Sequence, residues 1–254
     1  MGKARLQMFD AVAPVLKSAL KLFGPWTKSL HPEYPFWRLK NDGLAEFVAD
    51  GPLRLRLSSN DPTVSSLREQ NARGGLLAAD YEMLSGNLQL QSLVAHKILD
   101  AHFPESIHDE IIRFFELTLD EPHAADRTSN ANFRKAVLSA YGNCCALTGF
   151  NLEVAGRSVG VEAAHIFWPQ SGGNDQVSNG IAMTVLHRKL FHLGLFSIRP
   201  DYKVVVSSEA VDKGGDTNFS LSAMSGRSLT LPPDKELWPN PTALSWHQRW
   251  VFRG

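Results

Sequence analysis

Three polar residues follow one another in the order His165, Asn179 and His187 in the C-terminal half of the chain. Metal-assisted hydrolysis of a phosphodiester needs a neutral histidine close to the phosphate, because that histidine takes a proton from the attacking water. It also needs a divalent cation on the leaving and non-bridging oxygens, with ligands on an element that faces the histidine. This order predicts a general base at His165 and a metal ligand at His187. Asn179, between them, would fix its loop or coordinate the metal.

Each candidate also has a simpler interpretation. A histidine in an apolar strand is usually a hydrogen-bonded core group, and the Asn179-Gly180 pair is typical of an ordinary turn. Another histidine, His192, lies five residues after His187, which is too far round a regular helix for the two to share a face. A break near Phe191 would turn both inward, whereas in the simpler interpretation His192 only caps the helix.

The candidates need a strand, a loop and a helix to position them. The segment 159–166 is predicted to be a strand whose alternation places His165 on one face and Glu162 on the other. The polar loop PQSGGNDQVSN then leads into a short helix expected at 180–190. The rest of this half is predicted to hold a helix at 132–141, a strand at 151–155, a hairpin around Pro200-Asp201 and a short helix in the tryptophan-rich tail.

The N-terminal half is expected to be a mixed helical domain with short β-hairpins. Helices are predicted at 7–23, from Asp61-Pro62-Thr63 through Leu67 to a break at Gly74-Gly75, at 88–102 and at 107–117. Short strands are predicted at 34–39, 44–48 and 53–57, joined by Asp-Gly turns. The polar segment 119–130 contains Pro122 and marks a domain boundary. The chain is thus expected to be α+β, with domains at 1–120 and 121–254.

Composition sets limits on the class of protein. The chain has 254 residues and 43% apolar content, and no apolar run approaches the ~20 residues that span a bilayer. The N-terminal segment lacks the apolar core of a signal peptide. Two adjacent cysteines, Cys144 and Cys145, exclude a disulfide framework and a four-cysteine zinc site. We therefore expect a cytoplasmic protein with no membrane partner.

The charge distribution permits a nucleic-acid partner without establishing one. Formal net charge is zero, but residues 1–123 carry 13 basic and 16 acidic groups, whereas residues 124–254 carry 13 and 10. The first 40 residues hold seven basic and two acidic groups. Binding DNA requires a local basic patch that replaces counterions, not a basic protein overall.

Residues 133–254 resemble the HNH (ββα-metal) endonuclease family found in restriction enzymes. The matching pieces, in the same order, are FRKAVLSAY, CALTG, EAAHI, GGND, NGIAM, LH..LF.LGLFSI and the terminal LSWHQRWVFRG. The resemblance implies that His165 is the general base, that Asn179 and His187 are the other catalytic residues, and that the cofactor is a divalent metal, Mg or Mn.

The chain departs from this family's pattern HH..FD.G at two positions. Arg188 stands where the second histidine would be, and His192 stands where the aspartate would be. Histidine can ligate a divalent metal, so His192 is a candidate ligand beside His187. Arg188 cannot ligate a metal but can bind phosphate. The residue before His165 is alanine rather than a carboxylate, which leaves Glu162 as the nearest acidic candidate ligand.

The N-terminal half resembles the sulfur-binding domain of restriction enzymes that recognise phosphorothioate-modified DNA. The matching pieces are EYPFWRLKNDGL, SSNDPT..SLREQNARGGL and LDAHFPESIHDEI. The resemblance implies that Tyr34 and Pro35 form part of an apolar wall for the sulfur, and that Arg38 and Arg73 contact the DNA backbone. An apolar wall suits sulfur because it is more weakly hydrated than the oxygen it replaces. This sequence shows no counterpart of the basic, leucine-rich helix with which the family's domain begins.

Three functions are compatible with these observations. The first is a modification-dependent restriction endonuclease that binds phosphorothioate double-stranded DNA and cuts nearby. The second is an HNH nuclease that does not depend on sulfur. The third is a DNA-binding protein that does not cut, because Arg188 and His192 have changed its site. A homodimer is compatible with cutting two strands.

Overall fold

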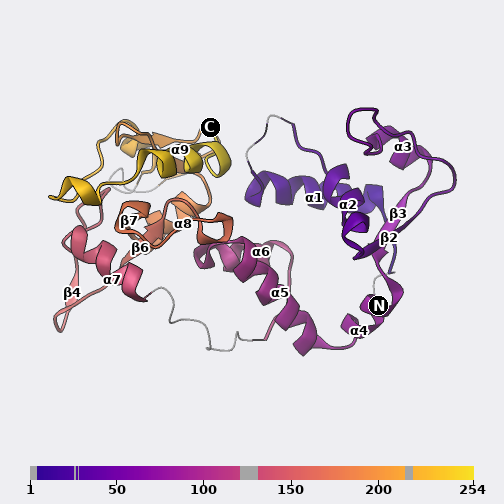
Figure 1. Cartoon of the computed structure of the whole chain (residues 1–254), viewed down its shortest axis with the longest axis horizontal. Coiled ribbons are helices and arrows are strands. Elements are labelled where there is room, and N and C mark those ends of the chain that lie inside the picture. The colour runs from indigo at the N-terminus through magenta and orange to yellow at the C-terminus, as the bar shows by residue number, and fades with distance from the viewer. Residues whose placement is uncertain (1–4, 26, 28, 121–130, 215–219) are drawn as a thin grey trace. The chain divides into compact units, whose positions relative to one another are not determined.

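The computed structural model describes residues 5–25, 27, 29–120, 131–214 and 220–254 (Figure 1). It consists of two compact units. The first is formed by residues 1–95 and 118–120, and the second by residues 96–117 and 121–254. The boundary expected at 119–130 lies mostly on residues 121–130, which are outside the described residues.

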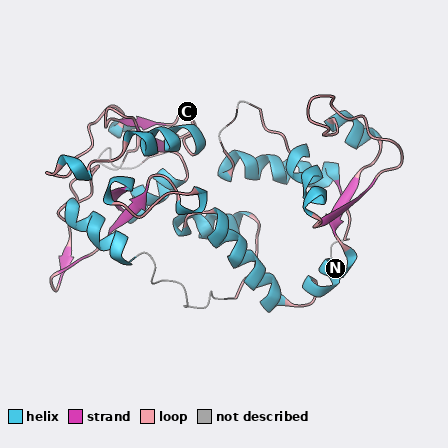
Figure 2. Cartoon of the chain, viewed as in Figure 1, coloured by secondary structure: helices cyan, strands magenta, loops and turns pink. Residues whose placement is uncertain are grey.

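The first unit packs short helices on a small antiparallel sheet, coloured by type in Figure 2. The sheet has the order β1-β3-β2, with Phe47 opposite Gly74. Phe9, Phe36 and Leu67 form the centre of its core. The elements are β1 (Gln7–Met8), α1 (Phe9–Phe23), α2 (Glu33–Arg38), β2 (Ala45–Val48), α3 (Val64–Glu69), β3 (Arg73–Leu76), α4 (Ala78–Leu84) and α5 (Leu88–His102), within which the division between the units falls.

Two expectations for this unit are wrong. The strand expected at 34–39 is helical, because Pro35 lies in the first turn of α2, where a backbone N–H has no intrahelical partner to lose. The glycines at 74 and 75 do not break a helix. They lie in β3, where a Cβ on Gly74 would come within 2.3 Å of the Phe47 ring. The segment 53–57 contributes only the bridge from Leu55 to Pro62. The helix start at Thr63 is confirmed, because its side chain accepts a hydrogen bond from Ser66 N.

The second unit is built around two antiparallel strands followed directly by a helix. These are β6 (Val161–His165), β7 (Gly180–Thr184) and α8 (Val185–His192). The short helix expected at 180–190 is therefore wrong in its first half. The remaining elements are α6 (His108–Phe114), α7 (Ala131–Ala140), β4 (Glu153–Val154), β5 (Arg157–Ser158), β8 (Phe196–Ile198), β9 (Val204–Val206) and α9 (Pro241–Trp250). The sequence does not predict β5, whereas the others lie close to their expected positions.

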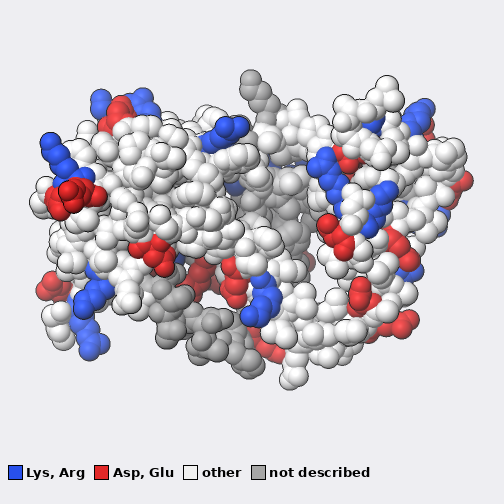
Figure 3. Space-filling model, in the orientation of Figure 1, with Lys and Arg blue, Asp and Glu red and all other residues white. Residues whose placement is uncertain are grey.

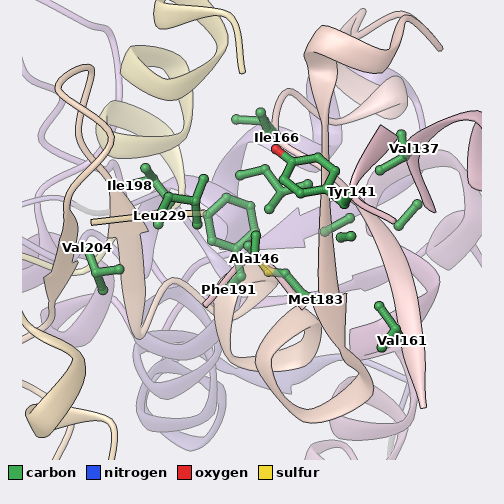
Figure 4. Close-up of a cluster of buried hydrophobic side chains, with 14 of the residues drawn as sticks. Val137, Tyr141, Ala146, Val161, Ile166, Met183, Phe191, Ile198, Val204 and Leu229 are labelled. Atoms are coloured by element: carbon green, nitrogen blue, oxygen red, sulfur yellow. The ribbon is translucent and has the colours of Figure 1, made fainter. Parts of the chain in front are cut away.

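A large apolar core holds these elements together (Figure 4). Ile181, Met183 and Phe191 are fully buried in it, so both β7 and α8 are fixed from the core side. Gly180 allows α7 to approach β7 closely. A Cβ at this position would lie only 2.4 Å from Val137 and 2.9 Å from Phe133 of α7. The core thereby fixes the start of β7, which pairs with the end of β6.

Charged side chains of both signs are interspersed over the described residues on the face shown in Figure 3. Both cysteines are free thiols. None of the described helices is long and apolar enough to cross a bilayer.

Candidate nuclease site and sulfur-binding region

His165 lies at the end of β6, opposite Gly180 of β7. Its ring stacks on Phe133 of α7, with 3.8 Å between the ring centroids and 8° between the planes. Its Nε2 lies 2.8 Å from Oδ1 of Asp175 in the polar loop. Because a carboxylate only accepts, the neutral ring carries its proton on Nε2 and keeps a lone pair on Nδ1. An imidazole in this tautomer has the lone pair that a general base needs.

The surroundings of His165 favour its neutral form. Burial lowers the pKa of His165, Asp175 opposes that effect, and the positive charge of Arg188 lowers it further, so that the net shift is downward. A neutral imidazole at ordinary pH is what a general base requires. Sequence reasoning missed Asp175, whose only signal is its place in the polar loop ten residues after His165.

Asn179 has every amide group engaged by backbone. Its Oδ1 accepts from Phe167 N at 2.9 Å, and its Nδ2 donates to Phe167 O at 2.9 Å and to Asn174 O at 2.8 Å. It is 5% exposed. Asn179 thus ties the end of the loop to the segment after β6, and in doing so it positions the neighbouring Asp175.

His187 lies in a different environment from His165. Its Nδ1 is 2.7 Å from Oγ1 of Thr184, the N-cap of α8, and 4.0 Å from Sγ of Cys145. Burial would raise the pKa of Cys145, but hydrogen bonds from His187, Thr148 and the backbone outweigh it and lower that pKa to about 7. The His187 ring also packs edge to face on Phe196, with 6.5 Å between the ring centroids. These contacts anchor the first turn of α8.

His192, the last residue of α8, contacts the backbone of His165. Its Nε2 lies 3.2 Å from the backbone carbonyl oxygen of His165, and its Nδ1 lies 2.6 Å from Oγ of Ser106. Burial lowers the pKa of His192 well below its ordinary value, and Arg188 adds to the effect. The break near Phe191 that would turn His187 and His192 toward the same side does not occur, because α8 continues to His192. Both nitrogens of this buried neutral ring are engaged by the protein.

Glu162 is paired with two arginines. Arg188 donates to its Oε2, and Nη1 of Arg134 lies 3.6 Å from its Oε1. Within the described chain, no three His, Cys, Asp or Glu side chains form a group that could hold a metal ion. Glu162 and both ring nitrogens of His192 are engaged by other groups of the protein, whereas His187 uses only Nδ1, for Thr184. One remaining imidazole nitrogen does not fit a resident divalent ion, which takes several ligands.

The buried histidines make the stability of this unit depend on pH. His247 of α9 is fully buried, with Nδ1 at 2.9 Å from Ser197 Oγ and Nε2 at 3.1 Å from Phe191 O, and burial lowers its pKa to about 3. In the unfolded chain its pKa returns to about 6.5. Between these values the unfolded state binds the extra proton, so the free energy of unfolding decreases as the pH is lowered, by about 1.4 kcal/mol per pH unit.

Urea unfolding at pH 7, 6 and 5 measures this effect. The control is His247→Gln, which keeps an amide donor for Phe191 O but does not titrate. We expect a shallower fall in the variant than in the wild type. Parallel curves would show that His247 does not contribute to the pH dependence.

In the first unit, the Tyr34 side chain contacts one aromatic ring and two arginines. The His31 ring stacks on it with centroids 4.7 Å apart, and the Arg38 guanidinium lies 4.1 Å from the Tyr34 centroid. Nη1 of Arg56 lies 3.3 Å from its hydroxyl. Tyr34 and the neighbouring Pro35 are both half-buried. The ring is therefore held rigidly with only part of its surface accessible.

Two buried carboxylates hold these arginines in place. Asp61 accepts two hydrogen bonds from Arg38, at 3.0 and 2.6 Å, and Glu33 accepts one from Arg56 at 2.8 Å. Bonding to Arg38 lowers the pKa of Asp61. The Arg38 side chain is still 50% exposed. Sequence reasoning selected Arg38 but missed Arg56, which lies 22 residues from Tyr34 in the chain.

Arg73, the other candidate for backbone contacts, lies on β3. Its Nη2 is 2.7 Å from Oδ1 of Asp50, and its side chain is 42% exposed. It is thus placed at the surface of the first unit and tethered by one carboxylate.

Comparisons with known protein families give two separate matches. Residues 1–120 match the family described as ScoMcrA-like, DNA sulfur-binding domain, and residues 145–199 match HNH endonuclease. No curated protein sequence matches the chain.

Three solved structures show a distant similarity. They are a modification dependent TagI restriction endonuclease (20% identity, TM-score 0.35, 49% of this chain and 39% of that chain), the sulfur binding domain of ScoMcrA complexed with phosphorothioated DNA (21%, 0.36, 44% and 71%) and the Type IV phosphorothioation-dependent restriction endonuclease ScoMcrA (19%, 0.36, 55% and 27%). The chain thus spans well under half the length of TagI and of full ScoMcrA. These similarities are too low to assign an activity.

Residues 145–199, which contain the strand–strand–helix site, are thus similar to HNH endonuclease. Residues 1–120 are similar to the ScoMcrA-like DNA sulfur-binding domain.

Proposed function

We propose that the chain is a modification-dependent DNA endonuclease. Its N-terminal half binds double-stranded DNA that carries a phosphorothioate, and its HNH domain hydrolyses a phosphodiester nearby. The observation that carries the proposal is the pairing of His165 with Asp175 at the end of β6, beside a loop tied down by Asn179.

His165 acts as the general base. Its Nδ1 lone pair takes a proton from the water that attacks phosphorus, while Nε2–H donates to Asp175 and so stabilises the imidazolium that forms. Stacking on Phe133 restricts the ring to one plane. Asn179 is a positioning residue, because it holds the loop and does not offer a free group to substrate.

Tyr34 and Pro35 supply the apolar surface for sulfur. A phosphorothioate is an anion whose sulfur is more weakly hydrated than oxygen, so a site for it needs an apolar contact next to positive charge. Tyr34 and Pro35 provide the apolar contact, and Arg38 and Arg56 provide the positive charge. Arg73 and Arg188 are the further candidates for contacts with DNA phosphates.

A plasmid assay tests the function. Purified chain is incubated with phosphorothioate-containing and unmodified plasmid, in Mg²⁺, in Mn²⁺ and in EDTA. We expect nicking or linearisation of the modified plasmid only. Equal cutting of both plasmids would instead indicate an HNH nuclease that does not depend on sulfur. Loss of cutting in EDTA is the result that the sequence-based prediction of a Mg or Mn cofactor requires.

A second candidate function is DNA binding without cleavage. The observation that favours it is the Arg188–Glu162 pair in the site, because this pair occupies the one acidic candidate ligand. Binding of modified DNA without cutting in any of the three solutions would establish this function. Gel filtration of the bound chain would also test the expected homodimer.

A further inference from the structure

Beside the candidate base lies an ion cluster made entirely by the protein. Glu162 contacts Arg188 and lies 3.6 Å from Arg134, and the side chains of Glu162 and Arg188 are only 27% and 19% exposed. Partly buried pairs are screened less than exposed ones. The carboxylate is therefore already neutralised by guanidinium groups, with little charge left to attract a metal ion.

Arg188 lies on α8, one residue after His187 and four residues before His192, which is about one helical turn. Nε2 of His192 lies 3.2 Å from the backbone carbonyl oxygen of His165. The fixed positive charge of Arg188 therefore lies among the candidate site residues, where a bound divalent ion would otherwise be the largest local charge.

One donor of Arg188 is unused. Its Nε is buried and lacks a hydrogen-bond partner among the described residues. Because Nε is shielded from solvent, an incoming phosphate oxygen would meet the 19% of the Arg188 side chain that is exposed. A phosphate oxygen is the acceptor that the planar guanidinium fork fits best.

We propose that the guanidinium of Arg188 takes the place of a resident divalent ion in this HNH site and binds a DNA phosphodiester directly. This inference rests on the proposed function and deepens it. A divalent ion entering the DNA-free site would meet the repulsion of Arg188 and a Glu162 that is already paired. The DNA-free protein therefore binds Mn²⁺ weakly here.

The first test measures Mn²⁺ binding to the full chain without DNA, by electron paramagnetic resonance of the free ion. Arg188→His removes the fixed cation and adds an imidazole ligand, and we expect it to bind one Mn²⁺ about tenfold more tightly or better. The matched control, Arg188→Lys, keeps the charge and should bind as weakly as the wild type. Tight one-site binding by the wild type, or no gain in Arg188→His, would overturn the proposal.

The second test does not depend on Arg188→His folding. The affinity for a short unmodified duplex is measured against salt concentration. Arg188→Gln should reduce the slope of log K against log salt by about 0.9, the value for one phosphate contact. Arg199→Gln is the control, since that guanidinium is held by Asp201 on an exposed turn, and it should leave the slope unchanged. Equal slopes for wild type and Arg188→Gln would contradict the phosphate contact.

The two tests separate this inference from the proposed function. A chain that cuts no DNA but gives these Mn²⁺ and salt results would overturn the endonuclease and leave the role of Arg188 in place. A chain that cuts modified DNA and binds Mn²⁺ tightly would overturn the role of Arg188 and leave the proposed endonuclease in place.

Discussion

Replacing His165 with alanine should lower the single-turnover rate of DNA cleavage by about 10²–10⁴-fold, the usual contribution of a general base. DNA affinity should change little, because the ring acts on water and not on the groups that hold the duplex. A gel assay with enzyme in excess over labelled modified duplex measures the rate, and fluorescence anisotropy measures the affinity. Cleavage by His165→Ala at close to the wild-type rate would remove the assignment.

Asp175→Asn is the matched comparison for His165→Ala. It weakens the contact that orients the base but keeps the imidazole, and Asp175 is 57% exposed, so water can replace part of the contact. We expect a loss smaller than that of His165→Ala. In the wild type, the neutral form of His165 is the active one and its pKa is lowered. Cleavage should therefore fall only as the pH drops below the ordinary histidine value of about 6.5.

Replacing Tyr34 with serine should lower affinity for a phosphorothioate duplex much more than affinity for the unmodified duplex. A phosphate oxygen gains little from an apolar contact, so only the sulfur loses by its removal. Loss of an apolar contact in a pocket is worth about 1–3 kcal/mol, which predicts a fall of about tenfold or more in the ratio of the two affinities. Competition binding with two duplexes that differ in one sulfur atom measures this ratio.

Two variants show whether the effect belongs to the ring of Tyr34. Tyr34→Phe keeps the ring between His31 and Arg38 and loses only the hydroxyl near Arg56, so it should keep the preference for sulfur. Arg38→Ala should weaken both duplexes alike, as loss of a phosphate contact does. A ratio that Tyr34→Ser leaves unchanged would exclude the ring from the sulfur contact.

The sequence predicted the elements whose patterns are local. The strand that ends at His165 is buried except at Glu162, so its apolar run predicts it and not an alternation in exposure. The helix at 88–102 has apolar residues at helical spacing and follows from that periodicity. β7 was mistaken for the start of a helix because Ile181, Ala182 and Met183 are all buried. A strand buried on both faces reads as a continuous apolar run, which a buried helix resembles.

The site was predictable only in part, because its residue types are visible in the sequence but their partners are not. His165 follows from the order His165, Asn179 and His187 across a strand, a loop and a helix. Asp175 is one of several polar residues in a loop, and only the fold brings it to the ring. The sequence analysis places Glu162 on the opposite face of the strand from His165, as the nearest acidic candidate ligand. Its pairing with Arg188 and Arg134 joins α8 and α7, and no local pattern encodes such a contact.

The position of the cut tests most directly whether one half of the chain finds the modification and the other half cuts. A long duplex with a single phosphorothioate is digested with the full chain, and the ends of the products are mapped by sequencing. The account predicts ends at a short, fixed distance from the sulfur, absent from the same duplex without sulfur. Ends scattered along the duplex, or equal in the unmodified duplex, would contradict it.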